Sequence, residues 1–243
     1  IIMTFCYELE FCGASLSKLT EILRVNLKTK TSKINYQNFN LMTEVGVTNE
    51  KYAGGELISP IYTDLQLCLK ELKDKLIFLK DNGAYIPLNS SMTGFHIHVG
   101  KDILVNQKHY EHLLKFLYAF EYEIYELACY GKIIRSNFWN NAHPLDFNDI
   151  IGFLANYPST TIFSSKKNAF RIDRETYELR YFNSSIVYSE LESALYFATQ
   201  LSQYVVSDNF DTERIERYFQ NRDYYGKRYN YDRDEFMRRE LKL

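Results

Sequence analysis

The sequence predicts an α+β fold built around a mainly antiparallel sheet. Strand patterns and amphipathic helical patterns follow one another without the regular strand–helix–strand alternation that a parallel sheet requires. The chain has 243 residues, 46% of them hydrophobic, with only 10 glycines and 4 prolines. This length and composition are those of a globular protein with one sizeable core. We therefore expect a single domain over residues 1–243.

Each element is predicted from the spacing of its apolar residues. Alternating or short apolar runs bounded by turn residues predict strands over residues 3–11, 33–48 (a strand or a hairpin), 54–60, 93–100 and 177–182. Apolar residues three and four positions apart predict helices over residues 16–27, 63–81, 106–130, 146–155 and 187–206. Between the last two helices, residues 156–168 are the best candidate for a mobile loop.

Charge and cysteine content argue against several classes of function. The net charge of −2 provides no global attraction to nucleic acid or to a membrane. Basic residues in the C-terminal stretch 222–241 alternate with acidic ones, which favours a solvated terminal helix over an RNA-binding arm. The four cysteines form no CxxC pair, so we expect a reducing, cytoplasmic setting. We expect neither a membrane span nor a signal peptide, and the oligomeric state stays open.

Residues 7–11, YELEF, combine a strand pattern with two carboxylates. Successive side chains on a strand point to opposite faces, so Glu8 and Glu10 share one face of the strand. The simplest interpretation is a strand with one solvated side. The alternative is that this side forms the floor of a site.

Three further strand patterns place chemistry-bearing residues on one face. In GFHIHVG the polar face carries His96 and His98, and in GGELIS it carries Glu56. In YELRYF, alternation puts Glu178, Arg180 and Phe182 opposite the three residues Tyr177, Leu179 and Tyr181. Ordinary solvated faces favour Lys, Ser and Thr, which are almost missing here. The shared pattern therefore favours a site.

Electrostatics indicates what such a site needs. Two carboxylates on one strand face lie roughly 7 Å apart and repel by about 2 kcal/mol at an effective dielectric constant of about 20. Arg180 supplies one compensating charge, and a divalent cation would supply more. Carboxylate oxygens suit Mg²⁺ or Mn²⁺, whereas histidine shifts the preference toward Mn²⁺ or Zn²⁺. The sequence therefore predicts a cation-binding polar face.

Competing motifs do not match. Val99 and Gly100 follow His98, which rules out an HxHxDH zinc site, and Asp102 is a poor substitute for the glutamate of a cupin-like oxygenase. Neither GxxxxGK[ST] nor GxGxxG occurs.

The remaining reactive residues lack a motif. Cys6 lies on the Glu8 face by parity and is best interpreted as a small buried residue. We expect His109 and His112 on the surface of their helix and leave His143 unplaced.

Four blocks together carry a family resemblance: FCYELEF, GGELISP, TGFHIHVG and RIDRETYELRYFN. In this order and approximate spacing, over residues 3–190, they resemble the amidoligase family. That family belongs to the carboxylate–amine ligase superfamily, which also contains glutamine synthetase and glutamate–cysteine ligase. Residues 207–243 would then be a C-terminal helical extension of one catalytic domain.

The resemblance implies a curved, mainly antiparallel sheet with helices on its convex face and ATP plus two or three Mg²⁺ or Mn²⁺ ions on its concave face. It implies that a carboxylate is activated as an acyl phosphate and that an amine then attacks it to form an amide. The implied metal ligands are Glu8, Glu10, Glu56, His96 and Glu178. Arg180 would bind phosphate and stabilise charge, His98 would line the nucleotide or metal pocket, and Arg171 would help to hold phosphate.

One departure from the family pattern concerns the second strand, before which relatives place an aspartate. Here the stretch offers Asn49 or Glu50, so one ion site is in question. Three alternatives stay open: a metal-dependent hydrolase using the same residues, a non-catalytic nucleotide- or metal-binding module, and an interaction protein whose acidic strands are merely solvated. The substrates are equally open, because the resemblance does not say which carboxylate and amine are joined or whether the acceptor is a small molecule, a peptide or a protein.

Overall fold

The computed structural model describes residues 2–14, 33–36, 39–42, 54–86, 93–130, 143–158, 163, 165, 168–222 and 230–243. Three sequence predictions therefore lie outside the described residues: the helix over 16–27, the role of Asn49 or Glu50, and most of the middle of the loop over 156–168.

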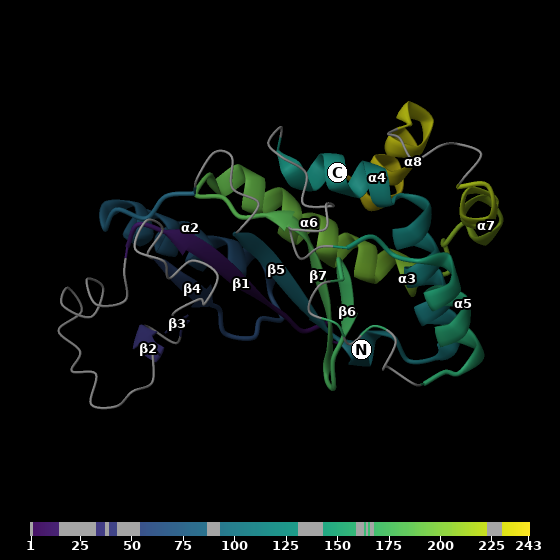
Figure 1. Cartoon of the computed structure of the whole chain (residues 1–243), viewed down its shortest axis with the longest axis horizontal. Coiled ribbons are helices and arrows are strands. Elements are labelled where there is room, and N and C mark those ends of the chain that lie inside the picture. Colours follow the sequence, from purple (N-terminus) through teal and green to yellow (C-terminus); the bar gives the residue numbers. More distant parts are fainter. Residues whose placement is uncertain are drawn as a thin grey trace.

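A seven-stranded sheet forms the centre of the described structure, and every pair of neighbouring strands in it is antiparallel (Figure 1). The strands are β1 (Phe5–Cys12), β2 (Lys33–Tyr36), β3 (Phe39–Met42), β4 (Gly54–Ile58), β5 (Gly94–Gly100), β6 (Phe170–Ile172) and β7 (Thr176–Asn183). Their order in the sheet is β2-β3-β4-β1-β5-β7-β6. The mixed helix and antiparallel-sheet class is thus confirmed, whereas the short edge strand β6 was not predicted.

The helices follow the predicted order with one difference. They are α2 (Leu65–Asp81), α3 (Gln107–Ala119), α4 (Glu121–Cys129), α5 (Phe147–Ala155), α6 (Tyr188–Val205), α7 (Thr212–Gln220) and α8 (Tyr231–Leu241), with a 3₁₀ turn, η1, at Lys101–Ile103. The single helix predicted over 106–130 was wrong. Phe120, with φ −110° and ψ 13°, separates α3 from α4. A break of one residue leaves the apolar spacing almost intact, so the pattern does not reveal it.

Side chains that accept hydrogen bonds from the first turn fix where several helices begin. Asp64 accepts from the backbone N–H groups of Gln66 and Leu67 at the start of α2, and Asn106, Asp146 and Asn230 do the same for α3, α5 and α8. Such caps stabilise a helix by about 1 kcal/mol.

The apolar face of the sheet packs against helices on one side of the molecule. Tyr7, Leu9, Ile97 and Leu179 are fully buried on this face, and the rings of Tyr7 and Phe95 lie 5.3 Å apart. Helix α6 contacts β5 and α4 contacts β7. Figure 1 shows α2 and α6 behind the sheet, so the opposite face carries the polar residues.

The pairing of β5 with β7 contains a bulge. Phe95 pairs with Phe182 and Ile97 pairs with Leu179, so His96 alone faces the two residues Arg180 and Tyr181. A bulge inverts the alternation beyond it. Phe182, which alternation placed on the polar face, therefore lies on the apolar face and packs edge-on against Phe197 of α6 with centroids 5.7 Å apart.

The prediction that His109 and His112 lie on the surface of their helix needs correction. His112 is buried rather than on the surface, with Nδ1 2.8 Å from the carbonyl oxygen of Val205 and its ring stacked on Phe210 at 3.8 Å. His109 is half-buried. Both corrections arise because α3 packs against the C-terminal end of α6 and against α7, which its own sequence cannot reveal.

The C-terminal extension is part of the core rather than a solvated appendage. A helix was predicted there, but one face of α8 is buried through Phe236, Met237 and Leu241. Two buried ion pairs link this region to the first turn of α4: Arg222 with Glu121 at 2.7 Å and Arg233 with Glu123 at 2.9 Å. Carboxylates in a first turn are also stabilised by the helix dipole.

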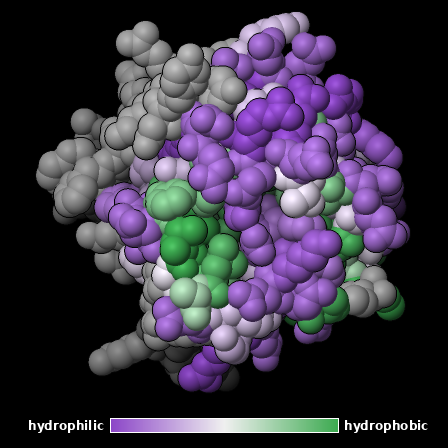
Figure 2. Space-filling view, turned by 90° about the vertical axis from the view of Figure 1, so that its right-hand side faces the viewer, coloured by the Kyte–Doolittle hydropathy of each residue, from purple (hydrophilic) through white to green (hydrophobic). Residues whose placement is uncertain are grey.

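The exterior is mainly hydrophilic on the side where α5 and α7 lie, with smaller hydrophobic areas (Figure 2). On α5 the exposed apolar side chains are Phe147 and Ile151. No helix among the described residues combines the length and apolarity needed to cross a bilayer.

Substituting Arg233 by methionine tests whether the C-terminal region contributes to the stability of the whole fold. The side chain of Arg233 is 1% exposed, so its loss leaves the Glu123 carboxylate buried without its guanidinium. We expect the free energy of unfolding, measured by urea denaturation, to fall by about 3–5 kcal/mol. Arg239→Met, at an exposed position on the same helix, is the control. If the free energy of unfolding fell by the same small amount in both variants, the C-terminal region would not contribute to the stability of the fold in this way.

Candidate functional site

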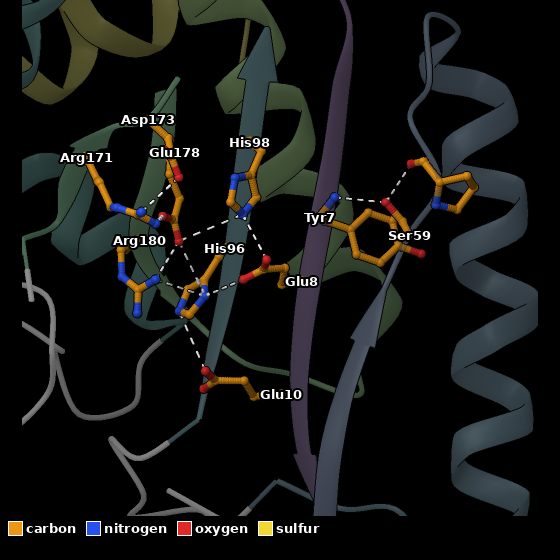
Figure 3. Close-up of polar contacts among 11 residues, drawn as sticks. Tyr7, Glu8, Glu10, Ser59, His96, His98, Arg171, Asp173, Glu178 and Arg180 are labelled. Atoms are coloured by element: carbon orange, nitrogen blue, oxygen red, sulfur yellow. Dashed lines mark hydrogen bonds and ion pairs between the residues drawn. The ribbon is translucent and has the colours of Figure 1, made fainter. Parts of the chain in front are cut away.

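Pairing among four neighbouring strands, β4, β1, β5 and β7, brings the polar residues together. The register aligns Glu8 with His96, Cys6 with His98, Glu10 with Glu56, and His98 with Glu178. Residues directly opposite in antiparallel strands share a face, so alternation on each strand becomes one continuous polar surface. Figure 3 shows the side chains of β1 (Glu8, Glu10), β5 (His96, His98) and β7 (Glu178, Arg180) converging in front of β5, between β1 and β7.

Glu8 lies between the two histidines of β5. Its carboxylate oxygens are 3.3 Å from Nδ1 of His96 and 3.3 Å from Nε2 of His98. Burial by itself raises the pKa of Glu8, but hydrogen bonds from both imidazoles outweigh burial and leave the pKa lowered. The pKa of His98 is raised in turn, because the hydrogen bond and charge of Glu8 outweigh desolvation. Glu8 is therefore a carboxylate at neutral pH.

Glu178 is held by two guanidinium groups. Nη1 of Arg180 donates to one oxygen at 2.5 Å, and Nη1 of Arg171 donates to the other at 3.1 Å. Burial tends to raise the pKa of Glu178, yet the charges of His96, Arg180 and His98 hold it below its ordinary value. Its side chain is 1% exposed, so this negative charge is stabilised almost entirely by the protein.

Arg171 and Asp173 form the outer rim of this arrangement. Nη2 of Arg171 donates to the half-exposed carboxylate of Asp173 at 2.8 Å. Both terminal nitrogens of Arg171 therefore bind carboxylates, and its predicted contact with phosphate stays a prediction.

Glu10 and Glu56 form a second acidic group beside the first. Glu10 is buried and its carboxylate accepts the backbone N–H of Gly94 at 2.5 Å. The other oxygen lies 3.9 Å from Nε2 of His96. Glu56 pairs directly with Glu10 in the register of β1 with β4. This part of the face is acidic, whereas the β7–β6 part carries both arginines.

The bulge aims Arg180 into the centre of the site. Besides binding Glu178, Nη1 of Arg180 lies 3.4 Å from Nδ1 of His96, and the side chain is 12% exposed. Its buried Nε–H has no hydrogen-bond partner in the described structure. An unused N–H of a buried guanidinium can donate a hydrogen bond to a bound oxyanion.

The donor set fits divalent cations. Two groups of side chains each bring ligand atoms within 4.8 Å of one another: Glu8, His96 and Glu178, and Glu10, Glu56 and His96. Nε2 of His96 is buried without a hydrogen bond, and Nε2 of His98 has the carboxylate of Glu8 at 3.3 Å as its partner. Mixed oxygen and imidazole donors suit Mn²⁺ or Zn²⁺, and the two carboxylates in each group also suit Mg²⁺. The two groups share His96, so any two ions would lie close together.

All eight residues predicted for the site lie on this face: Glu8, Glu10, Glu56, His96, His98, Arg171, Glu178 and Arg180. Their assignment to metal, nucleotide or catalysis stays a prediction. Asp173, which directly follows β6, was missed, although its position two residues after Arg171 was a signal. Cys6 is half-buried beside His98, and burial followed by the charges of Glu8 and Glu178 raises its pKa to about 11. Its thiol therefore stays protonated.

Comparisons with known proteins give a likeness of fold. No family model and no curated protein sequence matches the chain. Among solved structures, a bifunctional glutathione synthetase from Pasteurella multocida matches with a TM-score of 0.57 and 13% identity, over 98% of this chain and 43% of that one. The ligase PafA, in complex with the prokaryotic ubiquitin-like protein Pup, matches with a TM-score of 0.46 and 12% identity, over 84% of this chain and 45% of that one. The chain thus spans less than half the length of either protein.

The Glu8–His98 pair makes stability depend on pH. A raised histidine pKa stabilises the fold fully below the ordinary value of 6.5, and the contribution is lost as pH rises through the raised value. We therefore expect the thermal midpoint, measured with a chelator present, to fall as pH rises above 6.5, and to fall less in His98→Asn. His109→Asn, on α3, is the control. Parallel curves for wild type and His98→Asn would refute this assignment.

Proposed function

We propose that this chain is the catalytic unit of an ATP-dependent carboxylate–amine ligase that forms an amide through an acyl phosphate. The observation that carries the proposal is the polar face itself, where two three-residue groups of potential cation ligands meet around His96 beside Arg180. The fold likeness to a protein named as a glutathione synthetase is consistent with it. So are the four sequence blocks that resemble the amidoligase family.

The proposed reaction explains why both signs of charge are needed. A substrate carboxylate oxygen attacks the γ-phosphorus of ATP, the bond to the bridging oxygen breaks, and ADP leaves. The amine nitrogen then attacks the acyl carbon, inorganic phosphate leaves with the former carboxylate oxygen, and the nitrogen loses a proton. Phosphoryl transfer of this kind depends on positioning and on neutralising negative charge.

The residues divide into a cation-binding part and an anion-binding part. Glu8, Glu10, Glu56, His96 and Glu178 would hold two or three Mg²⁺ or Mn²⁺ ions, which when bound neutralise charge on the phosphates. Glu10 is pre-oriented by Gly94 N–H, and Glu178 by two arginines.

Arg180 would provide the main protein donor to the transferred phosphoryl group. Its Nη1 holds Glu178, so the guanidinium is fixed while its Nε–H remains for an oxyanion. His98 would line the nucleotide pocket, and Arg171 would keep Glu178 oriented and help to hold phosphate. The carboxylate substrate would then lie between Arg180 and the acidic group on β4 and β1.

A thermal-shift experiment tests nucleotide binding without knowledge of the substrates. We expect Mg²⁺ with a non-hydrolysable ATP analogue, at 100 times its dissociation constant, to stabilise wild type by roughly 2.7 kcal/mol. Glu10→Ala should lose this shift, and Glu213→Ala, on the exposed side of α7, should keep it. The absence of any nucleotide shift in wild type would refute the ligase, and a shift with metal alone would favour a metal-dependent hydrolase.

Arginine substitution tests the anion-binding part separately. A hydrogen bond from a charged group contributes about 1.5–3 kcal/mol, so Arg180→Ala should weaken binding of the Mg²⁺–nucleotide analogue by roughly 10- to 100-fold. Arg180→Lys should recover only part of the affinity, because lysine lacks the planar fork of donors. Isothermal titration calorimetry gives these values. Unchanged affinity in Arg180→Ala would remove Arg180 from the phosphate site.

A further inference from the structure

The backbone around Arg180 is irregular and needs support from outside the ladder between β5 and β7. Arg180 and Tyr181 are the two residues that face His96 alone, so the ladder is interrupted at that point. The N–H of Arg180 donates to the carbonyl oxygen of Ala169 at 2.7 Å, which continues the pairing of β7 with β6 beyond the end of β6. The position of the Arg180 backbone therefore depends on what holds Ala169 and Tyr181.

A single buried carboxylate, Glu121 at the start of α4, reaches both sides of this point. One of its oxygens accepts the hydroxyl of Tyr181 at 3.3 Å and the backbone N–H of Leu145 at 2.8 Å. The segment containing Leu145 in turn holds Ala169, because the N–H of Ala169 donates to the carbonyl oxygen of His143 at 2.9 Å. Glu121 thus holds Tyr181 directly and Ala169 through residues 143–145.

The C-terminal region holds Glu121 in place. Nη2 of Arg222, just after α7, donates to the second oxygen of Glu121 at 2.7 Å, and its guanidinium lies 3.8 Å over the ring of Tyr118. Glu121 is fully buried and Arg222 is 6% exposed. An ion pair this deeply buried is weak evidence for stability, because desolvation offsets the attraction, but it fixes one geometry.

We propose that Glu121, oriented by Arg222, is a positioning residue for Arg180, and that the C-terminal region thereby controls the geometry of the site. The proposal rests on the proposed function for its meaning in catalysis, but the positioning itself is independent of any ligand. Glu121 touches neither substrate nor cation. It acts through Tyr181 and through the chain that leads from Leu145 to Ala169.

A second ion pair provides a matched control within the same helical turn. Glu123 accepts from Nε and Nη2 of Arg233 and from the backbone N–H of Asn230. This pair is equally buried and also joins α4 to the C-terminal region. These three hydrogen bonds come from α8 and from Asn230 directly before it, not from β7 or residues 143–145. Breaking it destabilises the same junction without reaching Arg180.

Hydrogen exchange of the Arg180 amide tests the positioning without any ligand. We expect Glu121→Gln and Arg222→Gln to speed exchange of this amide by roughly 2- to 30-fold, the range of effect that changes along a coupled network produce. Glu123→Gln and Arg233→Gln should leave it within about twofold of wild type. Each variant is measured at a fixed interval below its own thermal midpoint. Tyr181→Phe, which removes only a hydroxyl, should also speed exchange and covers the case in which Glu121→Gln fails to fold.

Affinity for the Mg²⁺–nucleotide analogue supplies the functional readout. The Glu121 and Arg222 variants should bind it roughly 2- to 30-fold more weakly than the Glu123 and Arg233 variants, with Arg222→Lys intermediate. Equal effects in both pairs, on exchange or on affinity, would overturn the proposal. If wild type binds no nucleotide, the proposed function fails, and the exchange result still decides whether Glu121 positions Arg180.

Discussion

Glu8 and Glu178 lie on strands separated only by β5, and both are shielded from solvent far more than an isolated carboxylate tolerates. The compensating charges come from β5, β6 and β7 in the same sheet. Two imidazoles face Glu8, and two guanidinium groups share Glu178. This balance of charge constrains the rest of the structure, because it requires the strands to stay in one register. A slip of one residue would move every one of these side chains to the apolar face.

The helical layer enforces that register from the other side. The apolar residues that alternate with the charged ones are packed under α2, α4 and α6, so displacing a strand would expose a continuous aromatic core. The same layer introduces its own buried charges at the start of α4, and the C-terminal region provides their partners. Core packing and charge pairing therefore support each other from opposite faces of the sheet.

The strands that carry the site could be predicted from sequence because alternation is a local property. To place the site residues on one face, it was enough to know that side chains alternate along a strand and to assume that the strands pair. This holds for Glu8, Glu10, His96, His98 and Glu178. The bulge could not be predicted, since two adjacent apolar residues after Arg180 look like an ordinary strand end. Glu121 and Glu123 resemble solvated helix residues until their arginine partners, about a hundred positions later, are brought near. The cation-binding face follows from the crowded carboxylates, whereas the nucleotide assignment depends on the family resemblance, because no nucleotide-binding motif occurs in the sequence.

The bulge in β7 also determines how this sequence can vary. On the Glu178 side of Arg180 the strand tolerates polar residues at every second position, but beyond it Tyr181 and Phe182 are both buried and both needed. A deletion within this strand would return Phe182 to the polar face and remove its packing against Phe197 of α6. Homologous chains that keep the site should therefore keep the spacing from Glu178 to Asn183. Adjacent apolar residues directly after the arginine are the mark by which such chains can be recognised.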